Sequence, residues 1–313
     1  MKRILSIVLV VMLFVMVGCG SEPQAKEQKL SKLTIGLMPD TDSIPFIIAA
    51  EYGYFAEEGL EIELIPFKSA MERDAALQSG SLDGAVSDLL AVIFARSGGF
   101  SVYATSYTDG SYNLVAGGDT GIASAADLRG KEIAISRNTI IEYVTDEILA
   151  VNGVGEKDVS KVVIPQIPVR LEMLQSGNLA AAVLPEPMAS VAEFSGSRYV
   201  TGSGELGINP GVIVFTDSAI KEKEQSIRAM YRAYDKAANY LNNTPCADYI
   251  DLIMERSGFP GPARDALVLK PYHFAGLPAE KDVDEAVRWV KNKGLAGDYR
   301  YDELVSKLLT EGK

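Results

Sequence analysis

Leu77–Val86 reads LQSGSLDGAV and Leu174–Val183 reads LQSGNLAAAV, so seven of ten positions are identical at a spacing of 97 residues. The same spacing aligns two strand-like segments, Thr34–Pro39 and Lys131–Ser136. Self-similarity at a fixed spacing indicates a duplicated structural unit. The repeat therefore predicts two similar halves within one chain.

Both halves show the same order of strand, helix, strand, helix and strand, with Pro45–Phe55 and Glu142–Asn152 as matching helical stretches. Alternation of this kind is typical of mostly parallel sheets flanked by helices. We therefore expect an α/β protein of two similar lobes, hinged around a ligand cleft. Lobe 1 is expected over 32–116 and 212–313, and lobe 2 over 117–211, with chain crossings near Gly117–Gly121 and Asn209–Gly211.

The amino terminus predicts export. Lys2 and Arg3 precede an apolar run, Ile4–Val17, which is followed by Cys19. A basic start and a short apolar core are typical of a secretory signal peptide, and the run is shorter than the about 20 residues of a membrane-spanning helix. The segment resembles a bacterial lipoprotein signal, which predicts a signal peptide over 1–18, lipid on Cys19 and a flexible tether over 19–31. An ordinary secretory signal with a coincidental cysteine is the alternative.

The composition narrows the possible partners. The formal net charge is −12, and removal of Lys2 and Arg3 would leave 28 basic residues against 42 acidic ones. Such a chain is repelled by nucleic acid and by anionic lipid, so we expect no nucleic-acid partner and membrane attachment only through the lipid. His273 is the only histidine, and the metal, phosphate-loop and nucleophile-elbow motifs are missing. We expect no metal and no cofactor.

Three segments carry a family resemblance. Ala50–Glu63, with AEYGYFAEEGLEIE, resembles the signature GYFxxEGLxVE of substrate-binding proteins from ATP-driven importers, in the branch for nitrate, sulfonates, taurine and thiamine pyrimidine precursors. Leu77–Ala85 and Leu184–Pro187 resemble two further segments of that family, and the likeness covers Leu33–Ser218. The resemblance implies a type II periplasmic binding protein, expected to act as a monomer, that closes on a small molecule and delivers it to an ABC permease and its ATPase.

Candidate ligand-binding residues follow the predicted strands, where α/β sheets place their sites. They are Asp40, Asp42, Ser43, Ser87, Asp88, Arg137, Asn138, Thr139, Tyr143 and Glu186, with Tyr107 in a wall that continues to Thr108 and Asp109 near the hinge. Several have alternative roles. Asp88 and Thr139 could act only as helix caps, Arg137 could face solvent, and Glu186 could be a solvated turn residue.

The charges in these loops favour one kind of ligand. The loops contain one arginine and five carboxylates, namely Asp40, Asp42, Asp88, Asp109 and Glu186. Carboxylates suit amines and ring N–H groups, so we expect a nitrogen-containing molecule, with Tyr107 or Tyr143 available to stack on it. An oxyanion such as nitrate or a sulfonate is the alternative, because it would need donors and positive charge. We expect a solute receptor and no enzyme activity; an enzyme of the same fold and a solute sensor are the other possibilities.

Overall fold

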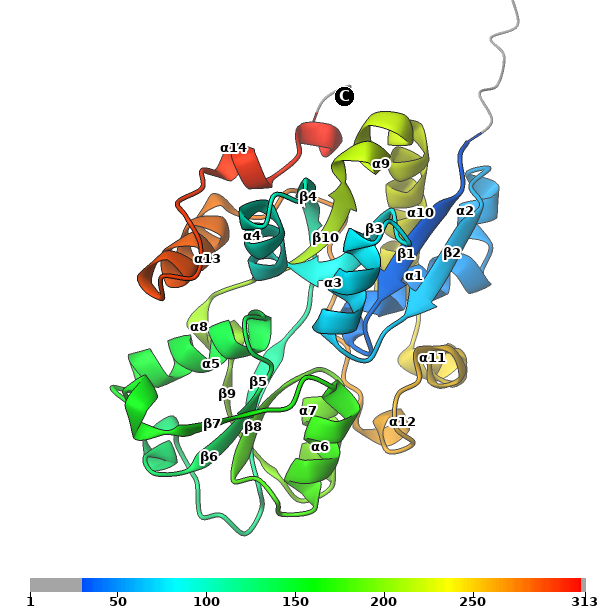
Figure 1. The fold of residues 1–313 in the computed structure, drawn as a ribbon. Coiled ribbons are helices and arrows are strands. Elements are labelled where there is room, and N and C mark those ends of the chain that lie inside the picture. The colour runs from blue at the N-terminus through cyan, green and yellow to red at the C-terminus, as the bar shows by residue number, and fades with distance from the viewer. Residues whose placement is uncertain (1–29, 311–313) are drawn as a thin grey trace, which may run out of the picture.

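The computed structural model describes residues 30–310, so the predicted signal peptide and Cys19 lie outside the described residues. Each lobe is built on one five-stranded sheet (Figure 1). The order in lobe 1 is β2-β1-β3-β10-β4, with bounds Ile62–Pro66, Leu33–Leu37, Gly84–Asp88, Gly211–Thr216 and Val102–Tyr107. The order in lobe 2 is β7-β6-β8-β5-β9, with bounds Ser160–Val163, Glu132–Ile135, Ala181–Pro185, Tyr112–Ala116 and Arg198–Gly202.

The two sheets have the same topology, which confirms the predicted fold class. In lobe 1, β1 runs parallel to β2 and β3, and β10 lies antiparallel between β3 and β4. In lobe 2, β6 runs parallel to β7 and β8, and β5 lies antiparallel between β8 and β9. Each mixed sheet therefore contains a single strand of opposite direction. The carboxyl ends of the parallel strands point toward the space between the lobes.

One predicted lobe boundary is wrong. Strand β5 was expected to end lobe 1 at residue 116, yet it pairs in lobe 2, with Leu114 opposite Val183. The first crossing of the chain therefore lies between Tyr107 and Tyr112 instead of near Gly117–Gly121. The partners of β5 lie 65 to 89 residues further along the chain, and no local sequence signal specifies such a pairing. The second crossing lies between β9 and β10, near the expected position.

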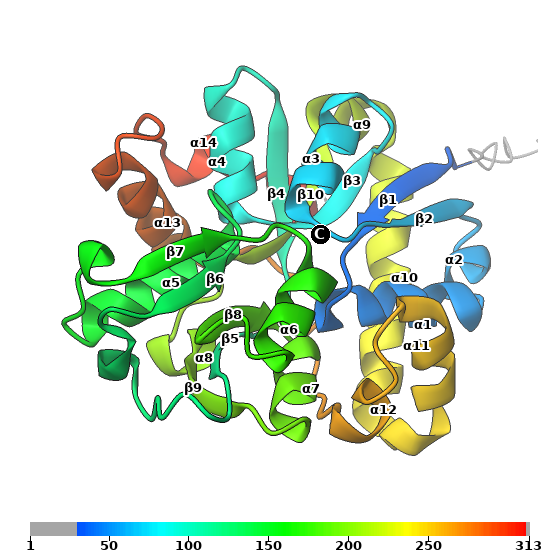
Figure 2. The ribbon, with the colours of Figure 1, turned by 60° about the horizontal axis from the view of Figure 1, so that its bottom comes forward.

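Helices cover both sheets (Figure 2). In order along lobe 1 they are α1 (Ile44–Glu51), α2 (Tyr54–Glu57), α3 (Ala70–Gln78) and α4 (Leu89–Ser97). Lobe 2 has α5 (Ile140–Val151), α6 (Ile167–Gln175), α7 (Met188–Phe194) and α8 (Ser203–Leu206). The carboxyl-terminal part has α9 (Asp217–Glu222), α10 (Glu224–Asn243), α11 (Ile250–Ser257), α12 (Ala263–Ala266), α13 (Glu280–Asn292) and α14 (Tyr301–Leu304).

The stretch over Pro45–Phe55 is not one helix. Gly53 takes a left-handed conformation with φ of 77°, which ends α1 and starts α2. The break turns Phe55 into the core, where it is 3% exposed. Within residues 30–310, none of the helices is long and apolar enough to cross a lipid bilayer.

The carboxyl-terminal segment joins the two lobes. Helix α13 packs on α4 of lobe 1, while Trp289 donates its Nε1–H to Asp146 of α5 in lobe 2 at 3.1 Å. Lys293 donates to the same carboxylate at 2.7 Å, and the ring of Tyr143 lies edge-on to Trp289 with centroids 5.8 Å apart. Trp289 is thus a core residue, as the sequence predicted, and α13 helps to hold the lobes together.

Candidate ligand site between the lobes

Two cavities lie between the lobes at the carboxyl ends of the strands. We name them the inner cavity, of about 40 Å³, and the outer cavity, of about 530 Å³. They are separated where the backbone N–H of Thr41 in lobe 1 donates to the carbonyl of Glu186 in lobe 2 at 2.9 Å. Consecutive residues face different cavities: Asp40 and Pro185 line the inner one, while Thr41 and Glu186 line the outer one.

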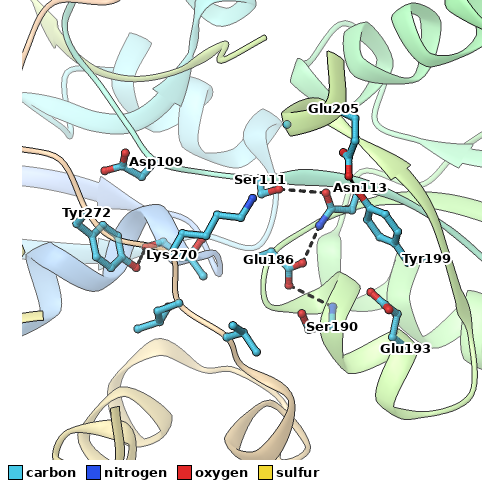
Figure 3. A pocket seen from close by; sticks show the side chains of 14 residues that line it. Asp109, Ser111, Asn113, Glu186, Ser190, Glu193, Tyr199, Glu205, Lys270 and Tyr272 are labelled. Carbon is cyan, nitrogen blue, oxygen red and sulfur yellow. Dashed lines mark hydrogen bonds between the residues drawn. The ribbon is translucent and has the colours of Figure 1, made fainter. Parts of the chain in front are cut away.

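Glu186 is an acid of the outer cavity that is held by two hydrogen bonds (Figure 3). It follows β8, and its Oε1 accepts a hydrogen bond from Asn113 Nδ2 at 2.6 Å. Its Oε2 accepts one from the backbone N–H of Ser190, at the start of α7, at 3.1 Å. Asn113 is fixed in turn because its Oδ1 accepts from Ser111 Oγ. These contacts hold a carboxylate at the wall of the cavity before any ligand enters.

The outer cavity is acidic. Among residues 30–310, its lining includes four acids, Asp109, Glu186, Glu193 and Glu205, and a single cation, Lys270. Two of these acids already have firm partners: Asp109 accepts from the backbone N–H of His273 at 2.9 Å, and Glu205 accepts from Tyr199 Oη at 2.5 Å.

Glu193, at the rim of the outer cavity, has a pKa that is affected by the neighbouring acids. Partial burial, together with the negative charge of Glu186, raises its pKa. Figure 3 shows Lys270 extending across the cavity from the segment that carries Tyr272. Unbalanced negative charge at Glu186 and Glu193 suits a ligand that brings N–H groups or a positive charge.

Two buried arginines line the inner cavity, one from each lobe. Arg73 on α3 donates from Nη1 to the carbonyl of Val86, and Arg170 on α6 donates from Nε to the carbonyl of Val183 at 3.0 Å. Both the arginines and the carbonyls are separated by 97 residues, the spacing of the sequence repeat. The duplication thus supplies matching cations to the two faces of the inner cavity.

Carboxylates reach the inner cavity from lobe 1 only. Arg73 Nη2 lies 2.8 Å from Asp74 Oδ1 and 3.7 Å from Asp88 Oδ2. Burial raises the pKa of Asp88, and the positive charge of Arg73 opposes that rise. Burial also raises the pKa of Asp40 to about 7, again opposed by Arg73. Asp88 additionally caps α4, because its Oδ1 accepts from the backbone N–H of Ala91 at 2.9 Å.

The expected ligand-binding residues separate into three groups. Five line one of the two cavities: Asp40, Ser87, Asp88 and Thr139 the inner cavity, and Glu186 the outer one. Asp88 and Glu186 therefore line different cavities. Asp42 and Ser43 lie buried beside the cavities, where Asp42 Oδ2 accepts from Tyr112 Oη at 3.0 Å and Ser43 Oγ donates to the carbonyl of Met38 at 2.8 Å.

Four expected residues lie outside both cavities. Arg137 and Asn138 are exposed in the turn before α5. Tyr143 is 1% exposed and packs on Trp289, so it cannot stack on a ligand here. Tyr107 packs against His273 with ring centroids 6.0 Å apart, and its backbone N–H donates to the carbonyl of Gly276. Asp109, by contrast, lines the outer cavity.

Sequence reasoning missed the arginines, Asn113 and Lys270. An arginine on a helix is ordinarily solvent-exposed, so nothing in the local sequence of Arg73 or Arg170 indicates a buried position. Their spacing of 97 residues, which equals that of the repeat, is the one signal that could have identified them. Asn113 was assigned to the wrong lobe with β5. Lys270 comes from a loop without a recognisable motif. Within the described part of the chain, there is no cluster of three or more His, Cys, Asp or Glu side chains that could hold a metal ion.

Two lobes with matched mixed sheets, closing on cavities at the strand ends, define the periplasmic-binding-protein fold. The chain belongs to the NMT1/THI5-like family, whose sequence profile it matches over residues 40–247.

Two curated proteins are similar in sequence. One is an ABC transporter periplasmic binding protein of Brachyspira hyodysenteriae, which is 24% identical over 78% of this chain and 75% of the relative. The other is an aliphatic sulfonates-binding protein of Bacillus subtilis, which is 22% identical over 74% of this chain and 72% of the relative.

A solved structure confirms the fold. The alkanesulfonate-binding protein SsuA of Xanthomonas axonopodis pv. citri, bound to MOPS, superposes with a TM-score of 0.74 at 17% identity, covering 85% of this chain and 94% of that one.

Proposed function

We propose that this protein is the extracytoplasmic solute-binding component of an ABC importer, and that it captures a small nitrogen-containing molecule between its lobes. The family membership and the two-lobed fold support the receptor role. The observation that supports the ligand class is the outer cavity, which Glu186 and Glu193 both line, with Lys270 as the single cation that the described part of the chain contributes. In this role the ligand is bound and released, with no bond made or broken.

A ligand N–H or ammonium group is expected to donate to Glu186. Asn113 and the Ser190 N–H use one acceptor direction on each oxygen, and a carboxylate offers about four in all. The remaining directions are free for a ligand in the outer cavity. A charge-assisted hydrogen bond of this kind contributes about 1.5–3 kcal/mol. The lobes would close over the ligand, with Lys270 reaching across the opening.

We expect Glu186→Gln to weaken ligand binding by about 10- to 100-fold, because the amide keeps the shape of the side chain and removes its charge. Native mass spectrometry of the full-length protein, purified from its host in detergent, would identify the co-purified molecule. Calorimetry with that molecule would then compare the dissociation constants of the variant and the wild type.

Glu172→Gln is the matched control, since Glu172 is an exposed acid of lobe 2 that lines neither cavity. It should bind as the wild type does. Wild-type affinity in the Glu186→Gln variant would contradict the acidic-site proposal. Turnover of the bound molecule during incubation would instead support the enzyme alternative.

We also propose that lipid on Cys19 anchors the protein to the membrane on the extracytoplasmic side. The apolar segment before Cys19 and the polar residues after it support this proposal. In fractionated cells, Cys19→Ala should move most of the protein from the membrane to the soluble fraction, because alanine cannot carry the acyl chains that would hold the protein there. A variant that stays as firmly bound as the wild type would refute the anchor.

A further inference from the structure

Arg170 is a buried cation for which lobe 2 supplies no counter-ion. Its side chain is 0% exposed, and its Nε and Nη1 donate to the carbonyls of Val183 and Ile164 at 3.0 and 2.8 Å. In residues 30–310 its Nη2 is buried without a hydrogen-bond partner. Burial alone lowers its pKa, to about 10, with no carboxylate contributing. A guanidinium stays charged at neutral pH even so, and an uncompensated buried charge is costly.

The repeat shows that this arrangement is specific to lobe 2. Arg73, the equivalent residue of lobe 1, has two carboxylates beside it, from Asp74 and Asp88. The positions 97 residues further along hold Leu171 and Pro185. Lobe 2 has therefore kept the arginine and lacks both of its acids. If Arg170 served only to tie α6 to β8, a neutral side chain could do so without the cost of the charge.

The inner cavity offers room for the missing counter-ion. Arg170 lines it together with Ser136, whose hydroxyl can donate a hydrogen bond, and Thr139, whose hydroxyl already donates to the carbonyl of Ser136 at 2.8 Å. Asp40 and Asp88 line the same cavity from lobe 1, where Asp88 lies 3.7 Å from Arg73. A volume of about 40 Å³ is room for about three water molecules on the scale where one needs ~10–15 Å³. A carboxylate, with three heavy atoms, fits this space, whereas a sulfonate is larger. The planar fork of an arginine also matches a carboxylate.

We propose that Arg170 is a ligand-binding residue, and that the inner cavity receives a carboxylate-sized anionic group as its counter-ion. The proposal rests on the solute capture proposed above and specifies its ligand further. The solute would place nitrogen at Glu186 in the outer cavity and an acidic group at Arg170 in the inner one. Such a molecule is amphoteric, like an amino acid or a heterocyclic acid. To span both cavities, it would have to break the Thr41–Glu186 hydrogen bond that separates them.

Sodium formate is the probe, because it carries the anionic group alone. Thermal unfolding of the full-length protein in detergent is followed against formate concentration, with sodium chloride holding the ionic strength constant. Formate should raise the Tm of the wild type saturably, as a ligand of the folded state does. Arg170→Met should raise the apparent dissociation constant for formate by at least tenfold, since it removes a charge-assisted pair. Methanesulfonate, which is larger, should have a weaker effect on the wild type.

Three variants make the outcome decisive. Arg198→Met, an exposed arginine of lobe 2 outside both cavities, should respond to formate as the wild type does. Arg170→Lys keeps the charge without the fork and should bind formate severalfold more weakly, which carries the test if the Met variant does not fold. Glu186→Gln should keep the full response to formate, so that this test is independent of the nitrogen site. An unchanged formate affinity in the Arg170 variants, or no saturable effect on the wild type, would overturn the proposal and leave the solute receptor standing.

Discussion

Arg73→Met should lower the free energy of unfolding by about 3–5 kcal/mol, the usual loss when one partner of a buried ion pair is removed. Arg73 is 3% exposed and Asp88 is 2% exposed, and their charged groups lie 3.7 Å apart. Without the arginine, Asp88 keeps its buried position as the cap of α4 and loses the positive charge that offsets its burial. Urea denaturation measures the loss.

The loss of unfolding free energy in Arg73→Met should grow as the pH rises. Burial already raises the pKa of Asp88 in the folded state, and removal of Arg73 raises it further. An acid whose folded pKa lies above its unfolded value costs stability once the pH exceeds the unfolded value, near 3.9. The loss in Arg73→Met should thus be small near pH 4 and grow as the pH rises toward the folded pKa.

Two further variants test the cause. Adding Asp88→Asn to Arg73→Met should recover part of the stability, because asparagine still caps the helix and carries no charge. Arg170→Met should cost much less than Arg73→Met, since it leaves no carboxylate without a partner. Equal losses in the two arginine variants would show that their hydrogen bonds to the strand carbonyls, and not the ion pair, account for the effect.

Asp40 should make the protein less stable as the pH rises from about 4 to about 7. Its carboxyl is 6% exposed between the lobes, and burial raises its pKa to about 7. The unfolded chain releases this proton near pH 4, so between the two values the folded state binds more protons and stability falls with rising pH. A difference of about three pKa units corresponds to ~4 kcal/mol. Protonated Asp40 therefore contributes this free energy to stability in full below pH 4, and the contribution is lost above pH 7.

Asp40→Asn should remove most of this dependence and should be more stable than the wild type at pH 8. Asp40→Asn should also lower the pKa of Asp42, because that pKa is raised by burial and by the negative charge of Asp40. Urea denaturation at several pH values tests both statements, with Asp298→Asn, a change at an exposed acid, as the control. Parallel pH profiles of the wild type and Asp40→Asn would contradict the assignment.

The sequence predicted most of the framework because the repeat carries it. Strands at 34–39 and 131–136, the helices after them and the two-lobed architecture all follow from residues that are local in the chain. The place of β5 could not be predicted in the same way, because its pairing with β8 depends on residues about 70 positions away.

The candidate site was predicted less well for a similar reason. The loop positions after strands include Asp40, Asp88 and Glu186, and each of these residues lines one of the two cavities. Charge counting in those loops predicted an acidic cleft, and the outer cavity is acidic. The inner cavity is not acidic, because Arg73 and Arg170 also line it. Both arginines come from helices, and the charge count included loop residues only. Tyr143 was misjudged because α5 turns that side toward Trp289, a residue of the distant carboxyl-terminal segment.

The position of β10 also determines the order in which the lobes can form. All five strands of lobe 2 lie within residues 112–202, an unbroken stretch of chain. In lobe 1, β3 and β4 do not pair with each other, because β10 lies between them and contributes Val212 opposite both Ser87 and Tyr107. During synthesis from the amino terminus, lobe 2 can complete its sheet first, while β4 waits for residues 211–216. The cavities between the lobes therefore form only after most of the chain has been made, because lobe 1 needs residues 211–216 and the outer cavity needs Lys270.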